Sequence, residues 1–121
     1  MSDTQHVAEA YIAIWNDQNP TTRRTQIEAL FTEDATFVDP LADINGWDAI
    51  DQLIAGAQSQ FAGLTFSVAG NADGHHNIAR FTWHLSAPNT EEPIVIGFDV
   101  IALDDTNRIT QLHGFLDKVP A

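Results

Sequence analysis

The chain has 121 residues, which is enough for one domain with a substantial core but leaves little room for a second. Seventeen acidic side chains against five basic ones give a formal net charge of -12, which repels nucleic-acid phosphates and anionic lipid surfaces. We therefore expect a single domain over residues 1–121 that binds neither nucleic acid nor membrane.

Cysteine is absent, which excludes disulfides, thiol catalysis and zinc-thiolate sites. Residues 1–6 lack the basic and apolar regions of a secretory signal, and no apolar run reaches the length of a bilayer span. A soluble, cytoplasmic protein is the resulting expectation.

The first half of the chain has mainly helical spacing. Apolar residues recur at helical intervals over residues 7–15, and the polar stretch 16–19 ends that pattern. Asn19 before Pro20 predicts a capped start for a second helix, whose apolar face is supplied by Ile27, Leu30 and Phe31. The sequence thus predicts a helical hairpin.

A short strand and a third helix follow. Residues 35–38 are predicted to be extended and to end at Asp39-Pro40. Apolar residues from Trp47 to Phe61 then return to helical spacing, so a third helix is expected to end near Gly63.

From residue 64 onward the pattern is typical of strands. Alternation over residues 64–68 is expected to end in the turn-rich stretch 70–74, and residues 79–85 alternate again. Residues 94–103 are apolar on both faces, as in a covered central strand, and a turn leads into a last strand at residues 108–119. Residues 87–93 are the expected hairpin loop.

These elements predict an α+β fold in the order α-α-β-α-β-β-β-β. Three N-terminal helices would pack in a curved, mostly antiparallel sheet, giving a cone-shaped roll whose open end forms a pocket. The outer face of residues 94–103 and of the last strand would be apolar and uncovered. We therefore expect a homodimer through the outer face of the sheet.

Three widely separated residues would point into this pocket: Tyr11 on the first helix, Asp39 at the end of the short strand and Asp99 within the apolar run 94–101. A carboxyl group inside such a run must be paired, hydrated or neutral, because an isolated buried charge is too costly. Asp39 is expected to meet more water and to remain ionised.

The sequence resembles the nuclear transport factor 2-like superfamily, especially its SnoaL-like and ketosteroid-isomerase-like branches, in residues 10–16, 30–40, 97–99, 108–109 and 114–116. The resemblance covers nearly the whole chain and implies the cone-shaped fold. It does not fix the chemistry, because this scaffold carries isomerases, cyclases, epoxide hydrolases, dehydratases and binding proteins.

In the isomerase branch, a tyrosine of the first helix and a protonated strand aspartic acid donate hydrogen bonds to a substrate oxyanion, while another aspartate moves the proton. The resemblance implies these roles for Tyr11, Asp99 and Asp39. It favours an isomerase or cyclase that acts without a cofactor on a small apolar carbonyl compound. Tyr11 is the only tyrosine, so the additional tyrosines of ketosteroid isomerases are missing.

The expected cavity wall contains aromatic residues, aliphatic residues and glycines that would suit a planar or modest apolar ligand. The candidate substrate-binding residues are Trp15, Trp47, Phe61, Trp83, Gly97, Leu112, Gly114 and Leu116.

Each candidate also has a structural interpretation. Asp39-Pro40 is a common turn opener, Tyr11 and the tryptophans can be core residues, and Asp99 can face an intersubunit cation or water. A noncatalytic ligand-binding or dimerisation module therefore stays open as the alternative function.

The histidines and one arginine leave further alternatives. His75 and His76 would point to opposite faces of a strand, so no metal site is expected and solvated side chains in a hairpin turn are favoured. His84 and His113 can face either the cavity or the dimer surface. Arg80 is expected to pair with a surface acid, but if it lies beside Asp99 an epoxide-hydrolase-like site becomes possible.

Overall fold

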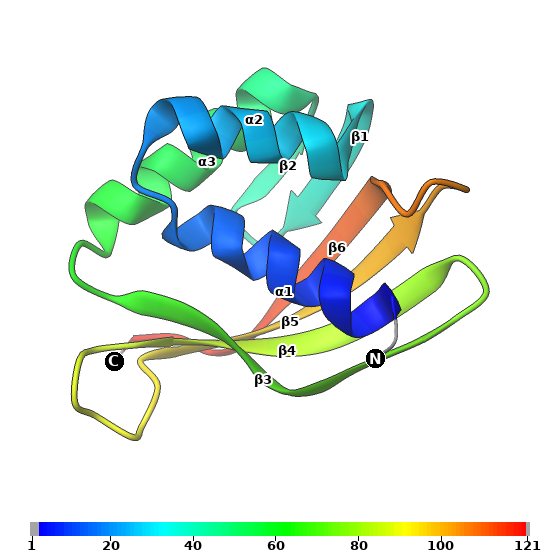
Figure 1. Ribbon diagram of the computed structural model, residues 1–121. Helices are drawn as coiled ribbons and strands as arrows, with labels where there is room; N and C mark the ends of the chain where they lie inside the picture. Colours follow the sequence, from blue (N-terminus) through cyan, green and yellow to red (C-terminus); the bar gives the residue numbers. More distant parts are fainter. Residues whose placement is uncertain (1–2, 121) are drawn as a thin grey trace.

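Three helices lie on one face of a curved sheet in the computed structural model, which describes residues 3–120 (Figure 1). The helices are α1 (Asp3–Asn16), α2 (Pro20–Leu30) and α3 (Trp47–Gln60). The strands are β1 (Phe31–Asp39), β2 (Ala42–Asn45), β3 (Thr65–His75), β4 (Ile78–Ser86), β5 (Val95–Leu103) and β6 (Ile109–Lys118). The predicted α+β roll is confirmed.

Local chemistry explains where α2 begins and how it is held. The Asn19 side chain accepts hydrogen bonds from the backbone N–H groups of Thr21 (2.9 Å) and Thr22 (3.3 Å), and Pro20 occupies the first turn. Arg23 of α2 is buried, and its guanidinium donates to Asp51 of α3 over 2.8 Å. This ion pair fixes α2 against α3.

The sheet has six strands in the order β2-β1-β6-β5-β4-β3. β1 runs parallel to β6, and every other neighbouring pair is antiparallel. β1 is longer than the predicted strand at residues 35–38, because Phe31 ends α2 and already pairs with Ile109 of β6. β2 was not predicted, since its four residues alternate between half-buried and exposed positions without an apolar run.

The prediction that residues 70–74 form a turn is wrong. β3 continues to His75, and its register against β4 shifts between Ala69 and Asp73. Gly70 has φ +73 at this irregularity, so the glycine-containing segment 70–74 forms a bulge inside the strand. The hairpin turn lies at His76 and Asn77.

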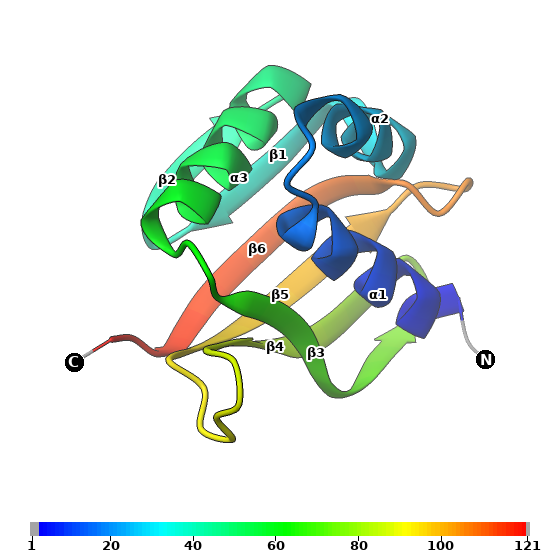
Figure 2. The same ribbon diagram turned by 60° about the vertical axis from the view of Figure 1, so that its left-hand side comes forward.

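The two faces of the sheet differ sharply in cover. Along β5, Val95, Gly97, Asp99 and Ile101 are buried while the residues between them are half-buried. The helices therefore pack on the face that carries Asp99, and no helix or strand within residues 3–120 covers the opposite face (Figures 1 and 2). None of the helices that the structure describes combines the length and apolar character needed to cross a bilayer.

Candidate functional site

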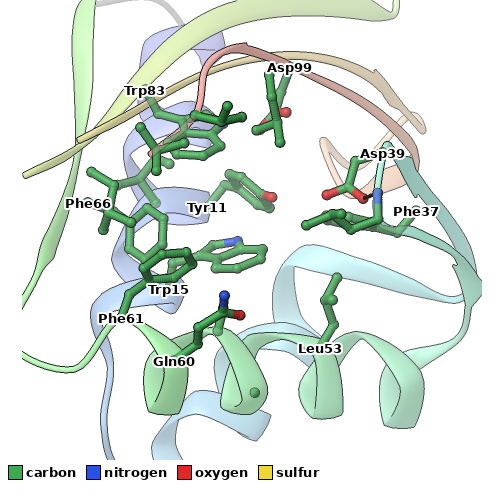
Figure 3. A pocket seen from close by; sticks show the side chains of 18 of the residues that line it. Tyr11, Trp15, Phe37, Asp39, Leu53, Gln60, Phe61, Phe66, Trp83 and Asp99 are labelled. Atoms are coloured by element: carbon green, nitrogen blue, oxygen red, sulfur yellow. Dashed lines mark hydrogen bonds between the residues drawn. The ribbon is translucent and has the colours of Figure 1, made fainter. Parts of the chain in front are cut away.

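A cavity of about 630 Å³ opens between α1, α3 and the inner face of the sheet. Figure 3 shows aromatic side chains along one side and two carboxyl groups at one end. The aromatic wall consists of Trp15, Phe61, Phe66 and Trp83, and Phe37 lies across the cavity beside Asp39. An apolar cavity with a few polar groups gathered at one end is the usual form of a small-molecule site.

Asp99 reaches the cavity because β5 alternates. It pairs with Phe81 of β4 and Gly114 of β6, and its side chain is turned to the helix-covered face. Only 4% of the residue is exposed, and Oδ2 has no hydrogen-bond partner among residues 3–120. A buried acid without a compensating cation is driven toward its neutral form.

Asp39 reaches the same end of the cavity from the last position of β1. Its Oδ1 accepts hydrogen bonds from the backbone N–H groups of Leu41 (2.9 Å) and Ala42 (2.8 Å). Oδ2 makes no hydrogen bond with the part of the chain that the structure describes, and the carboxyl group faces the space between Asp99 and Tyr11 (Figure 3). Asp39 therefore opens a turn and borders the cavity at once.

Gly114 shows how near the two carboxyl side chains lie. A Cβ atom added to Gly114 would sit 2.9 Å from Oδ1 of Asp99 and 3.1 Å from Cβ of Asp39. The strands β1, β6 and β5 thus place Asp39, Gly114 and Asp99 side by side, and only a residue without a side chain fits between the two acids.

Tyr11 approaches this end from α1 and is held by aromatic contacts. Its ring meets Trp15, Phe31 and Phe81 edge to face, with centroids 6.2, 6.0 and 5.7 Å apart. The Tyr11 hydroxyl has a hydrogen-bonding interaction with the Trp15 side chain, and Figure 3 shows it pointing toward the space beside Asp39. It can donate its proton to a ligand there.

The protonation states follow from burial and from the nearby acids. Burial, assisted by the charge of Asp39, raises the pKa of Asp99 to about 8. A hydrogen-bonding interaction with the Trp83 side chain opposes part of this rise. Burial also raises the pKa of Tyr11 well above its usual value, and the negative charges of Asp99 and Asp39 add to the rise. A hydrogen-bonding interaction with the Trp15 side chain opposes it. At neutral pH both Asp99 and Tyr11 therefore carry protons that they can donate.

Seven of the eleven candidate residues line the cavity: Tyr11, Trp15, Asp39, Phe61, Trp83, Asp99 and Leu116. Four do not line it. Trp47 lies elsewhere, because its Nε1 donates to the Phe31 carbonyl (3.0 Å) and Arg24 stacks 5.9 Å from its ring centre. Leu112 is a fully buried core residue.

The two candidate glycines shape the site without lining it. A Cβ atom at Gly97 would overlap the indole ring of Trp83, so this glycine lets Trp83 lie over β5. Gly114 separates the two acids, as described above.

The remaining candidates lie outside the cavity. Arg80 is exposed and pairs with Asp73 across 3.2 Å, so the arrangement required for an epoxide-hydrolase-like site beside Asp99 is not formed. His113 is exposed and His84 is half-buried on the outer face of the sheet. His75 ends β3 and His76 begins the hairpin turn; among residues 3–120 no group of three or more potential metal ligands comes together.

Several lining residues were missed in the sequence. Phe37 precedes Asp39 by two positions on one strand, so period-two alternation could have placed it on the same face. Phe66 could have been found in the same way. Gln52 and Gln60 of α3 also border the cavity, but polar residues of an amphipathic helix carry no such signal.

Comparison with known proteins agrees with this architecture. The family described as the SnoaL-like domain matches residues 8–112. The chain is 35% identical to a candidate isomerase of the SnoaL-like family from Agrobacterium tumefaciens, with a TM-score of 0.90 over 97% of this chain and 99% of that one. No curated protein matches the sequence significantly.

More distant structures share the fold alone. An NTF2-like protein of unknown function from Exiguobacterium has a TM-score of 0.71 at 17% identity, covering 92% of this chain and 98% of that one. An LEH-like epoxide hydrolase from M. tuberculosis has a TM-score of 0.64 at 16% identity, covering 94% of this chain and 82% of that one.

Proposed function

The chain belongs to the SnoaL-like domain family, and from its cavity we propose a cofactor-independent isomerase or cyclase that acts on a small apolar carbonyl compound. The observation that carries this proposal is the buried Asp99 carboxyl, whose pKa is raised to about 8 and which shares one end of the cavity with the Tyr11 hydroxyl and with Asp39. Two proton donors and one proton acceptor at the same end of an apolar cavity suit enolisation.

In the proposed reaction, Asp39 removes a proton from the carbon next to the substrate carbonyl. The electron pair of the broken C–H bond moves toward the carbonyl oxygen, which becomes an enolate oxygen. Asp99 and Tyr11 donate hydrogen bonds to that oxygen as its negative charge develops. In an isomerase, Asp39 then returns the proton to a different carbon. In a cyclase, the enolate carbon attacks a second carbonyl of the same molecule; the first carbonyl re-forms, the second C=O bond opens to an alkoxide, and that oxygen takes up the proton from Asp39.

The backbone around Asp39 supports its role as the base. Leu41 N and Ala42 N both donate to Oδ1, so the carboxylate is oriented and its Oδ2 is left for the substrate. A base must lie within hydrogen-bond reach of the proton that it removes, and holding the acceptor rigidly lowers the entropy cost of that approach. The reaction requires no cofactor, because side chains supply both the proton transfer and the stabilisation of the anion.

Binding of substituted phenols tests the anion site, since a phenolate imitates an enolate. We expect absorbance to report binding in the ionised form for the wild type, and a loss of at least tenfold in phenolate affinity for both Tyr11→Phe and Asp99→Asn. Asp34→Asn, which removes an exposed carboxyl group on β1, is the control. Phenolate affinity indifferent to both site changes would refute the paired donors.

The base is tested by turnover. For any ketone that the wild type isomerises or cyclises, Asp39→Asn is expected to lower kcat by at least a hundredfold while leaving phenolate binding measurable. Unchanged turnover of every active ketone in this variant would rule Asp39 out as the base.

A noncatalytic ligand-binding role is the second candidate. It is favoured by the predominantly apolar wall and by the lack of any tyrosine besides Tyr11. Under this alternative, a tight ligand would be recovered chemically unaltered from the wild type and from Asp39→Asn alike.

We also propose that two copies associate through the outer face of the sheet. Phe98 and Phe115 are paired neighbours on β5 and β6, and Phe115 is 57% exposed. Val38 on β1 adds to this apolar surface at 38% exposed. Phe98 is half-buried and Phe115 exposed, so the pair forms an apolar patch of the kind that marks a protein–protein interface.

A further inference from the structure

Trp15 carries a polar group that the fold leaves without a fully formed hydrogen bond. Its indole borders the cavity one helical turn after Tyr11, yet Nε1 is buried and has no partner at full hydrogen-bond geometry among the residues that the structure describes. By contrast, Nε1 of Trp47 donates to the Phe31 carbonyl across 3.0 Å. Buried N–H donors are normally satisfied, so the unpartnered donor of Trp15 requires an explanation.

Packing prevents the Trp15 ring from turning its N–H group elsewhere. Phe66 lies 5.3 Å and Phe37 6.3 Å from it between ring centres, while Tyr11 meets it edge to face. Figure 3 shows the nitrogen-bearing edge of the indole turned toward Tyr11. The N–H group is therefore held beside the tyrosine that is proposed to donate to the ligand.

We infer that Trp15 is a positioning residue of the anion site, whose indole N–H becomes a hydrogen-bond donor to the phenolic oxygen of Tyr11 when an enolate or phenolate is bound. This inference rests on the proposed function and adds a residue to it. A phenolic oxygen can accept one hydrogen bond while its own proton is donated elsewhere. When Tyr11 donates to an anion, its oxygen gains negative charge and becomes a better acceptor, so the two hydrogen bonds strengthen each other.

Two further observations support this arrangement. Tyr11 is the only tyrosine of the chain, so no second phenol can donate to it. Trp15 also acts to lower the pKa of Tyr11, against burial and the charges of Asp99 and Asp39. In the free protein Nε1 has no partner at full hydrogen-bond geometry within residues 3–120. The Trp15 side chain nevertheless lowers the pKa of Tyr11 through a hydrogen-bonding interaction, so the two groups already face each other and need only approach more closely.

Nuclear magnetic resonance of the three indole N–H groups provides a direct test in the intact protein. Signals of Trp15, Trp47 and Trp83 are assigned with single Trp→Phe variants, and the wild type is titrated with substituted phenols. We expect the Trp15 indole proton to move downfield when phenolate binds. Trp47 serves as the internal control, because its acceptor is a backbone carbonyl outside the cavity.

Trp15→Phe separates hydrogen bonding from packing. We expect phenolate affinity to fall about tenfold, while the affinity for a neutral ring of the same size, such as toluene, changes by less than about twofold. If Trp15 acts through Tyr11, its replacement in a Tyr11→Phe background has no further effect on phenolate affinity.

The outcomes distinguish this inference from the function on which it rests. If the wild type binds no phenolate, the proposed anion site is wrong, and the inferred role of Trp15 is wrong as well. If the wild type binds phenolate while the Trp15 indole signal stays in place and Trp15→Phe binds equally well, Trp15 is a wall residue only and the proposed anion site stands.

Discussion

The buried carboxyl of Asp99 makes the stability of this fold depend on pH. Its pKa is raised from 3.8 to about 8 by burial and by the charge of Asp39. Between these two values the folded protein keeps a proton that the unfolded chain has lost. Protonation of Asp99 therefore stabilises the fold fully below about pH 4, and this contribution is lost as the pH rises toward 8.

Comparison of the wild type with Asp99→Asn isolates this effect. The free energy of unfolding of the wild type, relative to the variant, is expected to fall between pH 5 and 8 by up to about 1.4 kcal/mol per pH unit and then to level off. Urea denaturation at several pH values measures the difference. Acids outside the cavity, such as Asp17 and Asp104, whose pKa values are lowered by hydrogen bonds, contribute equally to both proteins and cancel. A difference that does not vary with pH would contradict the raised pKa of Asp99.

The candidate residues differ in how well their positions relative to the cavity could be predicted from the sequence. Asp99 stood out because an acid interrupts an apolar run, and it lies at the cavity as expected. Asp39 had two competing interpretations, turn opener and cavity residue, and the structure gives it both contacts. Trp47 was placed wrongly because helical spacing gives the buried face of α3 but not whether that face meets α2 or the cavity.

At the scale of elements, strand register brings the two acids together. Gly114 pairs with Asp99 on β5, and the parallel β1 pairs Val38 with His113, so Asp39 comes to lie beside Gly114. Sequence patterns predicted the strands that carry these residues but not the parallel pairing of β1 with β6. Parallel pairing joins residues about 75 positions apart, and no local alternation encodes it.

Because local alternation does not encode strand pairing, β2 was not predicted and the end of β3 was predicted wrongly. β2 has too few apolar residues for a signal, and its strand forms because the turn after Asp39 returns the chain alongside β1. In β3, Gly70 and Gly74 suggested a turn, yet the strand continues through a bulge because β4 supplies hydrogen-bond partners on both sides of it.

Gly114→Ala tests whether the register holds the acids as close as described. The added methyl group would lie 2.9 Å from Oδ1 of Asp99 and 3.1 Å from Cβ of Asp39, so at least one carboxyl must move. We expect a loss of roughly 1–3 kcal/mol in the free energy of unfolding, as in other overpacked sites, and a fall of at least tenfold in phenolate affinity. Denaturant titration and phenol absorbance measure the two effects.

Gly56→Ala is the control for stability alone, because nothing lies within 4 Å of the methyl group that it adds to α3, although Gly56 borders the cavity. This variant is expected to be slightly more stable than the wild type, since alanine favours a helix over glycine. Wild-type stability and phenolate affinity in Gly114→Ala would mean that the two carboxyl groups lie farther apart.

For the whole molecule, the cavity and the outer face of the sheet are separate surfaces. The cavity lies on the helix-covered side of the sheet, whereas Phe98, Phe115 and Val38 lie on the opposite side. The proposed association of two copies and the binding of a ligand are therefore expected to respond to different substitutions.

Phe115→Asp places a charge on the outer face, next to Phe98. We expect sedimentation velocity to show a dimer for the wild type and a monomer for this variant, because burying an unpaired carboxylate in an interface is strongly unfavourable. Leu41→Asp changes an apolar residue that is 83% exposed at the cavity mouth, and it is expected to remain dimeric. Phe115→Asp should bind phenolate within about twofold of the wild type, because the sheet separates Phe115 from the cavity. A wild type that is monomeric at micromolar concentration would refute the proposed dimer.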